Sequence, residues 1–421
     1  MSSFYVVEHT IPCQHIREYP RALSGSQEDV LQLAVKQYIP KDNPNPQPGD
    51  VTIIGAHANA FPKELYEPLW DDIHARSKTN GFRIRSIWIA DVAQQGQSSV
   101  LNEQLLGNDP SWNDHARDLL HLINLKRDQM PRPLIGIGHS MGGNHLVNLA
   151  YIHPRLLTTL VLIDPVIQIH SSVAPEAGPS PARLSTFRRD VWPSREEAAK
   201  GFKASKFYQA WDPRVLDRWI QYGLRDMPTL IHPEKKEPPK VTLTTSLHQE
   251  VFTFLRPNYE GYGYNGKPVN RKTHPDVNPT VPTIYPFYRA EAHQAFFRLE
   301  ELRPSVLYIF GGKSEVGTPE SCKAKMEHTG VGVGGSGGAP AGRVKSVLFE
   351  DIGHLIAMEA VDRTAEHSSA WIASEMKIWK EDEDEHNQIW QAKSLLEKQT
   401  VDERWKTMIG GPLRNPKQTK L

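Results

Sequence analysis

The chain has 421 residues, and its 49 basic side chains balance 49 acidic ones, so its formal net charge is zero. That balance gives no field that would attract nucleic acid or membrane phosphates. The two cysteines, Cys13 and Cys322, exclude a disulfide framework and fit a reducing compartment. No apolar run reaches the roughly 20 residues that span a bilayer, and the N-terminus lacks the pattern of a secretory signal.

Strand and helix patterns alternate over residues 1–166, which predicts the N-terminal part of an open, mostly parallel sheet with helices on both faces. Helical spacing of apolar residues over 111–129 indicates an amphipathic helix, capped by Ser111 or Asn113. Short apolar or alternating runs predict strands at 31–40, 51–58, 82–91, 133–140 and 157–166.

The pattern breaks in residues 167–303, which are rich in Pro, Arg, Trp and Tyr, and we interpret this segment as a lid inserted over the sheet. Four of its aromatic residues suit either an apolar acyl group or packing of the lid itself: Trp192, Trp211, Trp219 and Phe252. The sheet resumes at 305–314 and 343–351, within a segment 304–400 that ends in a helical tail. Residues 401–421 form the C-terminal tail.

The sequence Gly138-His139-Ser140-Met141-Gly142 stands between a predicted strand and a predicted helix, as the nucleophile elbow of α/β hydrolases does. The serine of such an elbow occupies a strained turn, and glycines two positions before and after it remove clashes. The following helix points its N-terminus at the site, where backbone N–H groups face a developing oxyanion. We therefore predict that Ser140 is a nucleophile; a serine in a glycine-rich connection is the alternative.

A serine nucleophile needs a base, and the base needs an acid that orients it. His354 follows the last predicted strand, where the α/β-hydrolase order of serine, acid and histidine places the base. Two residues compete for the role of the acid. Asp164 ends a strongly apolar strand, where a buried carboxylate needs a partner, and Glu315 follows the next strand. We favour Asp164 and keep Glu315 as the alternative.

The oxyanion hole of this fold takes one N–H from the residue after the nucleophile, here Met141. The second N–H comes from the loop after an early strand, which reads His57-Ala58-Asn59 and makes Asn59 the candidate donor. The sequence implies no metal ion and no organic cofactor.

The chain closes on Thr419-Lys420-Leu421, which is close to the Ser-Lys-Leu address of peroxisomal proteins. Threonine keeps the small hydroxyl residue of that address, and the cation and the terminal leucine are unchanged. We therefore expect the peroxisomal import receptor as a partner and the peroxisomal matrix as the location. A chance tail is the alternative.

Several further stretches carry a family likeness: IREYP, KELYEPLWD, SWNDHARDLL, RDQMPRPLIGIGHS, HPRLLTTLVLIDP, DVWPSRE, GVGGSGG and the GHL around His354. Together they cover most of the chain and resemble fungal peroxisomal α/β hydrolases of secondary metabolism, above all the acyl-CoA hydrolases of the mycophenolic acid pathway. Hydrolases of host-selective toxin biosynthesis and a yeast peroxisomal lipase resemble the chain more distantly.

The resemblance implies a triad whose acid follows the strand after the nucleophile, which maps onto Ser140, Asp164 and His354. It also implies hydrolysis of a bulky acyl-CoA, such as mycophenolic acid-CoA or a related intermediate. Those relatives carry glycine where this chain has Ala58 and phenylalanine where it has Met141, which leaves the acyl group open.

Other functions stay compatible with the same residues. A lipase or carboxylesterase and an acyltransferase would use the same triad, and a non-catalytic binding protein of this fold is the alternative from another class. The oligomeric state is also open, with a homodimer among the options.

Overall fold

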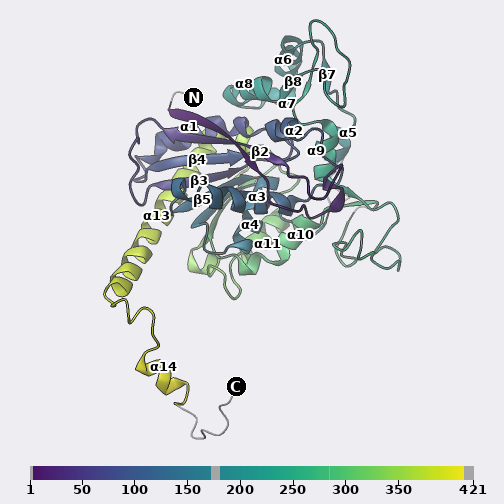
Figure 1. Ribbon diagram of the computed structural model, residues 1–421. Helices are drawn as coiled ribbons and strands as arrows, with labels where there is room; N and C mark the ends of the chain where they lie inside the picture. The colour runs from purple at the N-terminus through teal and green to yellow at the C-terminus, as the bar shows by residue number, and fades with distance from the viewer. Residues whose placement is uncertain (1–2, 172–180, 284, 412–421) are drawn as a thin grey trace. The chain divides into compact units, whose positions relative to one another are not determined.

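An eight-stranded sheet in the order β1-β2-β4-β3-β5-β6-β12-β13 forms the centre of the computed structural model, which describes residues 3–171, 181–283 and 285–411 (Figure 1). The strands from β4 to β13 in this order pair in parallel, whereas β1 and β2 are antiparallel to their neighbours. The bounds of the strands are β1 Phe4–Pro12, β2 Gln32–Pro40, β3 Val51–Ala56, β4 Ile84–Ala90, β5 Leu134–His139, β6 Thr159–Ile163, β12 Ser305–Gly311 and β13 Val344–Phe349. This mostly parallel sheet with its helices confirms the predicted fold class.

Strand β1 is the main element of this sheet that the hydrophobic pattern did not predict. Most of its side chains are exposed, and it pairs at the edge of the sheet from Phe4 opposite Pro40 to Pro12 opposite Gln32. Its place is therefore decided by pairing with β2 and not by an apolar face of its own.

The helices connect the strands as the alternating pattern predicts. Helix α3 begins after Ser111, whose side chain accepts a hydrogen bond from the N–H of Asn113, so Ser111 is the cap. Its residues Ala116, Leu119 and Ile123 are buried. The helices outside residues 167–303 are α1 Glu67–Ser77, α2 Gly96–Leu101, α3 Trp112–Leu125, α4 Met141–Ile152, α11 Pro319–His328, α12 Ile356–Glu359, α13 Val361–Gln391 and α14 Glu403–Met408.

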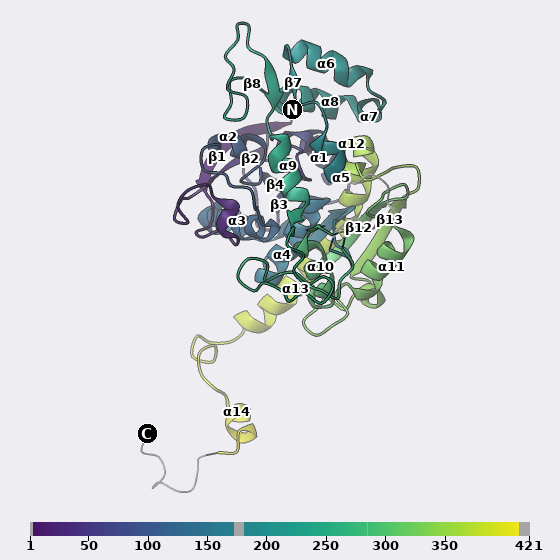
Figure 2. The same ribbon diagram turned by 90° about the vertical axis from the view of Figure 1, so that its right-hand side faces the viewer.

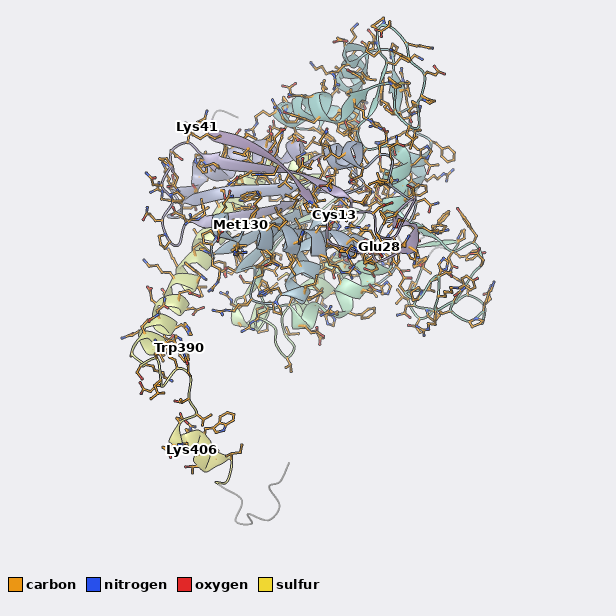
Figure 3. The ribbon with its side chains drawn as sticks, in the orientation of Figure 1. Cys13, Glu28, Lys41, Met130, Trp390 and Lys406 are labelled. Carbon is orange, nitrogen blue, oxygen red and sulfur yellow. The ribbon has the colours of Figure 1, made fainter. Side chains whose placement is uncertain are left out.

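A hydrophobic cluster of buried residues joins the sheet to these helices. Val35 and Ile54 of the strands pack in one cluster with Leu146 of α4. Cys13 and Met130 belong to the same cluster (Figure 3). Cys13 and Cys322 are both free thiols, as their separation in the sequence suggests.

The described residues of 167–303 form short elements and add no strand to the main sheet. Two small sheets, β7-β9-β8 and β10-β11, lie among the helices. The elements α6, α7, α8, β7 and β8 gather on one side of the main sheet in both views (Figures 1 and 2). Their bounds are α5 Pro181–Thr186, β7 Val191–Trp192, α6 Arg195–Ala204, α7 Lys206–Gln209, α8 Pro213–Tyr222, β8 Leu224–Asp226, β9 Val241–Leu243, α9 Leu247–Phe254, β10 Arg256–Pro257, β11 Phe287–Tyr288 and α10 Ala290–Phe297.

The tryptophans of this segment pack mainly against each other and against neighbouring aromatic rings. Trp211 and Trp219 lie 6.3 Å apart between ring centroids, and Phe202 lies 5.4 Å from Trp192 and 6.0 Å from Trp219. All three tryptophans are buried. Of the two roles expected for them, these contacts match packing within the segment.

The chain divides into two compact units, Met1–Glu375 and Met376–Leu421. The second unit holds the end of α13 and the short helix α14. The predicted targeting tripeptide Thr419-Lys420-Leu421 lies outside the described residues. Among the helices of the described ranges, none combines the length and the apolar character that a membrane crossing requires.

Candidate active site

The structure brings Ser140, Asp164 and His354 together at the carboxyl ends of β5, β6 and β13. The Nε2 atom of His354 lies 2.7 Å from Oγ of Ser140, and its Nδ1 atom lies 2.6 Å from Oδ2 of Asp164. His354 keeps 28% of its side chain exposed, so solvent reaches the ring. In this arrangement the imidazole can accept the serine proton while the carboxylate holds the opposite ring nitrogen protonated.

Ser140 occupies the strained turn that the elbow motif predicts, with φ at 56° and ψ at −118°. The glycines around it leave no room for a side chain. A Cβ on Gly138 would lie 2.6 Å from the carbonyl oxygen of Gly142, and one on Gly142 would lie 2.0 Å from that of Ala56. Gly142 therefore lets the first turn of α4 approach the end of β3, beside the loop that starts at His57.

Asp164 is almost fully buried, and its carboxylate accepts hydrogen bonds from both His354 and the Oγ hydroxyl of Ser314. Burial alone would raise its pKa, but the hydrogen bond and charge of His354 and the hydroxyl of Ser314 outweigh burial, so the pKa of Asp164 lies below its ordinary value. Glu315 is exposed, and the described residues record no hydrogen bond between it and His354. Ser314 had no catalytic signal in the sequence beyond its position next to Glu315.

The side chain of Asn59 is committed to its neighbours. Its Nδ2 group donates to the carbonyl oxygen of Glu250 on α9 at 3.1 Å, and its Oδ1 atom accepts from Nε2 of Gln95 at 2.6 Å. The backbone N–H of Asn59 is thus the group that matches the predicted oxyanion donor, together with that of Met141. Met141 is the first residue of α4, where N–H groups lack partners within the helix.

The two residues that flank Asn59 have occupied N–H groups. Ala58 donates to Oη of Tyr66 at 2.8 Å, and Ala60 donates to Oε1 of Gln95 at 2.8 Å. The carbonyl oxygen of Ala58 lies 2.8 Å from Nδ1 of His57. These bonds fix the peptide units on both sides of Asn59, so the loop has a defined conformation although alanine stands where glycine is usual.

Two further residues, Tyr66 and His139, form hydrogen bonds that lead to His354, and no sequence pattern predicted their place in the site. Tyr66 shares a hydrogen bond of 3.0 Å with Nδ1 of His139, and Nε2 of His139 lies 2.9 Å from the carbonyl oxygen of His354. Burial, followed by the nearby His354 ring, lowers the pKa of His139 to about 3, so this imidazole is neutral. His139 was visible in the sequence only as a variable position of the elbow motif.

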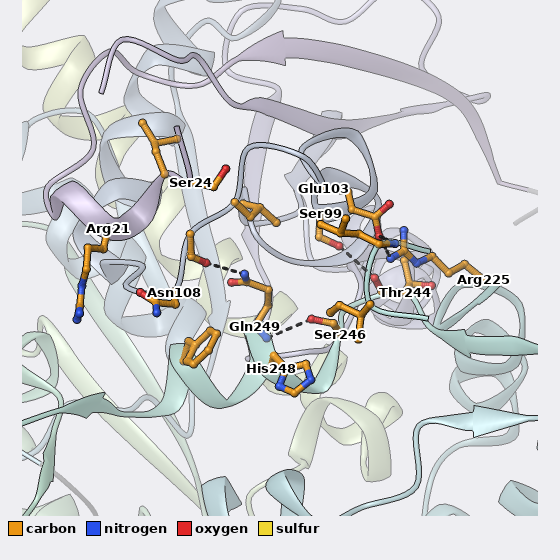
Figure 4. A pocket seen from close by; sticks show the side chains of 16 residues that line it. Arg21, Ser24, Ser99, Glu103, Asn108, Arg225, Thr244, Ser246, His248 and Gln249 are labelled. Carbon is orange, nitrogen blue, oxygen red and sulfur yellow. Dashed lines mark hydrogen bonds and ion pairs between the residues drawn. The ribbon is translucent and has the colours of Figure 1, made fainter. Parts of the chain in front are cut away.

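A cavity of about 480 Å³ lies beside α9 (Figure 4). Gln249 and Phe252 of α9 line it, and Gln249 also donates to the carbonyl oxygen of Gly107. None of the triad residues lines this cavity. The same helix contacts Asn59 through Glu250, so α9 borders the cavity and also holds the loop of the predicted oxyanion donor.

Comparisons with known proteins agree with the fold and with the resemblance. A family model described as "Serine aminopeptidase, S33" matches residues 80–212, which include Ser140 and Asp164. The type I acyl-CoA thioesterase mpaH' of Penicillium brevicompactum is 43% identical over 96% of this chain and 94% of its own length. An abhydrolase domain-containing protein of Alternaria alternata, ACTT2-2, is 28% identical over 66% of this chain and 97% of its own length.

A solved structure extends the likeness to the whole fold. The peroxisomal α/β-hydrolase Lpx1 of Saccharomyces cerevisiae has a TM-score of 0.64 and 16% identity, and the match covers 97% of this chain and 96% of that one. With the Penicillium relative at 43% identity, this chain belongs to the same α/β-hydrolase family as the fungal type I acyl-CoA thioesterases.

Proposed function

We propose that this protein is an acyl-CoA thioesterase in which Ser140 is the nucleophile, His354 the general base and Asp164 the acid that orients it. The observation that carries the proposal is the continuous hydrogen-bonded chain from Ser140 Oγ through His354 to Asp164. The family relation to the Penicillium thioesterases supports acyl-CoA as the substrate class. As the finer part of this proposal, the acyl group is a bulky one of fungal secondary metabolism, which the sequence resemblance suggests.

The reaction proceeds in two halves. Ser140 Oγ attacks the thioester carbon while His354 Nε2 takes the hydroxyl proton, and the oxyanion accepts hydrogen bonds from the N–H groups of Met141 and Asn59. The carbon–sulfur bond then breaks, CoA leaves as a thiol with the proton from His354, and an acyl ester remains on Ser140. Water attacks this ester with His354 as the base, which releases the carboxylic acid and restores the serine hydroxyl.

We also propose that the protein works in the peroxisomal matrix. The terminal Thr419-Lys420-Leu421 has the chemistry of a peroxisomal address, and the structural relative Lpx1 is a peroxisomal protein. Binding to the import receptor through these three residues is part of this proposal. A fluorescent fusion to the N-terminus should collect in peroxisomes and should spread through the cell when Leu421 is deleted.

The test of the mechanism is the substitution Ser140→Ala. Thiol release from a panel of CoA esters of increasing acyl bulk should fall by several orders of magnitude, with an unchanged circular dichroism spectrum. Near-normal hydrolysis by a folded Ser140→Ala protein would contradict the proposal. Faster turnover of p-nitrophenyl esters or triglycerides than of any CoA ester would indicate a lipase or esterase instead, and an ester or amide product would indicate acyl transfer.

A further inference from the structure

A chain of buried hydrogen bonds connects the loop of the oxyanion donor to the base. It starts at the N–H of Ala58, which donates to Oη of Tyr66 at 2.8 Å. It continues over 3.0 Å from Tyr66 to Nδ1 of His139 and over 2.9 Å from Nε2 of His139 to the carbonyl oxygen of His354. Its two ends therefore lie next to Asn59 and at the backbone of the base itself.

The direction of every bond in this chain follows from its partners. The carbonyl oxygen of His354 can only accept, so Nε2 of His139 carries the proton and Nδ1 is the acceptor. Tyr66 must then donate its hydroxyl proton to Nδ1 while its oxygen accepts from Ala58. Burial raises the pKa of Tyr66 and lowers that of His139 to about 3, so both stay neutral over the working pH range.

We propose that Tyr66 and His139 are positioning residues that hold the oxyanion loop and His354 at a fixed distance across the nucleophile. The inference rests on the proposed function, because it assigns a role in the same reaction. Neither residue touches the reacting atoms. They act through the backbone. The bond to the N–H of Ala58 fixes the main chain just before Asn59, and the bond to the carbonyl oxygen of His354 fixes the main chain that carries its ring.

The burial of the chain makes it rigid. Tyr66 is 2% exposed and His139 is fully buried, so water does not replace a lost partner easily. Tyr66 and His139 each donate one hydrogen bond and accept one within the chain. Removal of the Tyr66 hydroxyl therefore leaves the N–H of Ala58 and the Nδ1 atom of His139 unpaired. A small shift at either end would misplace a group that must lie within hydrogen-bond distance of the transition state.

The first experiment compares Tyr66→Phe with Tyr308→Phe. Tyr308 is a matched control, because its buried hydroxyl also has one side-chain partner, Thr329 at 2.8 Å, and among the described residues no hydrogen bond joins that hydroxyl to Ser140, Asp164 or His354. Tyr66→Phe should lower kcat on CoA esters about tenfold or more with KM within twofold, since the lost contact matters in the transition state. Tyr308→Phe should leave kcat within twofold, although both variants lose similar stability in urea unfolding.

The second experiment uses His139. His139→Gln keeps a side-chain N–H near the carbonyl oxygen of His354, whereas His139→Leu removes it. We expect the glutamine variant to recover at least fivefold in kcat over the leucine variant. Adding Tyr66→Phe to His139→Leu should cause little further loss, because the chain is already broken.

A fluorophosphonate probe separates failure of this inference from failure of the proposed function. Labelling of the wild-type protein at Ser140 supports the function, and absence of labelling overturns both. If the wild-type protein is labelled, the rate of labelling should be lower in Tyr66→Phe, by a factor similar to the loss in kcat. Equal kcat in Tyr66→Phe and Tyr308→Phe, or equal kcat in the two His139 variants, would overturn the positioning role.

Discussion

At the scale of single residues, the carboxylate that faces His354 is set apart by its surroundings. Asp164 sits at the end of a buried strand and accepts hydrogen bonds from His354 and Ser314, whereas Glu315 faces solvent. The loop that contains Glu315 still contributes to the site, because Ser314 from that loop stabilises the charged form of Asp164. Substitution of Ser314 would therefore remove a hydrogen bond to Asp164, whereas substitution of the neighbouring Glu315 would change only an exposed side chain.

We expect Asp164→Asn to lower kcat by about 10⁴-fold, because an asparagine amide donates to Nδ1 and leaves the proton on Nε2, where Ser140 needs an acceptor. Glu315→Gln, the control, should stay within twofold of the wild-type kcat. Thiol-release assays on both proteins, with circular dichroism to check folding, provide the measurement. A larger loss in Glu315→Gln than in Asp164→Asn would reverse the assignment.

A second prediction at this scale concerns which group of Asn59 acts as the donor. Asn59→Ala removes the side-chain bonds to Glu250 and Gln95 but keeps the backbone N–H. We expect kcat to fall by less than about tenfold, compared with the 10²- to 10³-fold loss that follows removal of an oxyanion donor. A loss of a hundredfold or more would mean that the side chain itself binds the oxyanion.

The residue types and their order in the sequence pointed to Ser140 and His354, and the structure brings these two residues together with Asp164. They left Asp164 and Glu315 as competitors, because both follow apolar strands and only the side-chain contacts distinguish them. Tyr66 could not be predicted, since its partners Ala58 and His139 are brought near it by the sheet and not by spacing along the chain.

At the scale of elements, the close approach of α4 to β3 depends on one hydrogen atom in place of a methyl group. The Cβ of an alanine at position 142 would lie 2.0 Å from the backbone oxygen of Ala56. That oxygen belongs to strand β3 and cannot move away on its own. By contrast, Gly201 in α6 has open space where its Cβ would be. Two helical glycines in the same protein thus have opposite steric environments.

We therefore expect Gly142→Ala to reduce the free energy of unfolding by about 1–3 kcal/mol or more, since α4 must move away from β3. Gly201→Ala, the matched control, should raise it by about 0.5–1 kcal/mol, because alanine favours a helix interior. Urea unfolding curves measure both. Stabilisation by Gly142→Ala would show that the first turn of α4 moves without cost.

The same scale explains which elements the sequence predicted well. The predicted strands that became β3, β5 and β6 are short apolar runs buried on both sides by helices, so their composition predicts them directly. Strand β1 is exposed over most of its length and depends on pairing with β2, which no local pattern reveals. Pairing across distant segments is the information that one-dimensional patterns lack.

For the whole molecule, four buried histidines contribute to the dependence of stability on pH. Burial lowers the pKa of His57 and His115, and it lowers the pKa of His139 and His145 to about 3 from an ordinary value of 6.5. These rings are neutral in the folded protein but take up protons in the unfolded chain below pH 6.5. The stability that they contribute is therefore present above pH 6.5 and is lost as the pH falls toward 3.

We expect the free energy of unfolding to fall steadily between pH 6.5 and 4.5, with a slope of up to about 1.4 kcal/mol per pH unit for each histidine. His145→Leu should flatten this slope, because one such ring is removed. The lowered pKa of Asp164 adds a further loss only below its ordinary value of 3.8, outside this interval. Urea unfolding at several pH values tests this, and an unchanged slope in His145→Leu would contradict it.

His354 follows β13, the last strand of the main sheet, and this position has a consequence during synthesis of the chain. Ser140 and Asp164, the proposed nucleophile and acid, are made less than halfway through synthesis, but the proposed base follows β13 at the edge of the sheet. A chain that stops before position 354 therefore lacks the base proposed for Ser140. On the proposed mechanism, hydrolysis therefore requires a central sheet that is complete through β13.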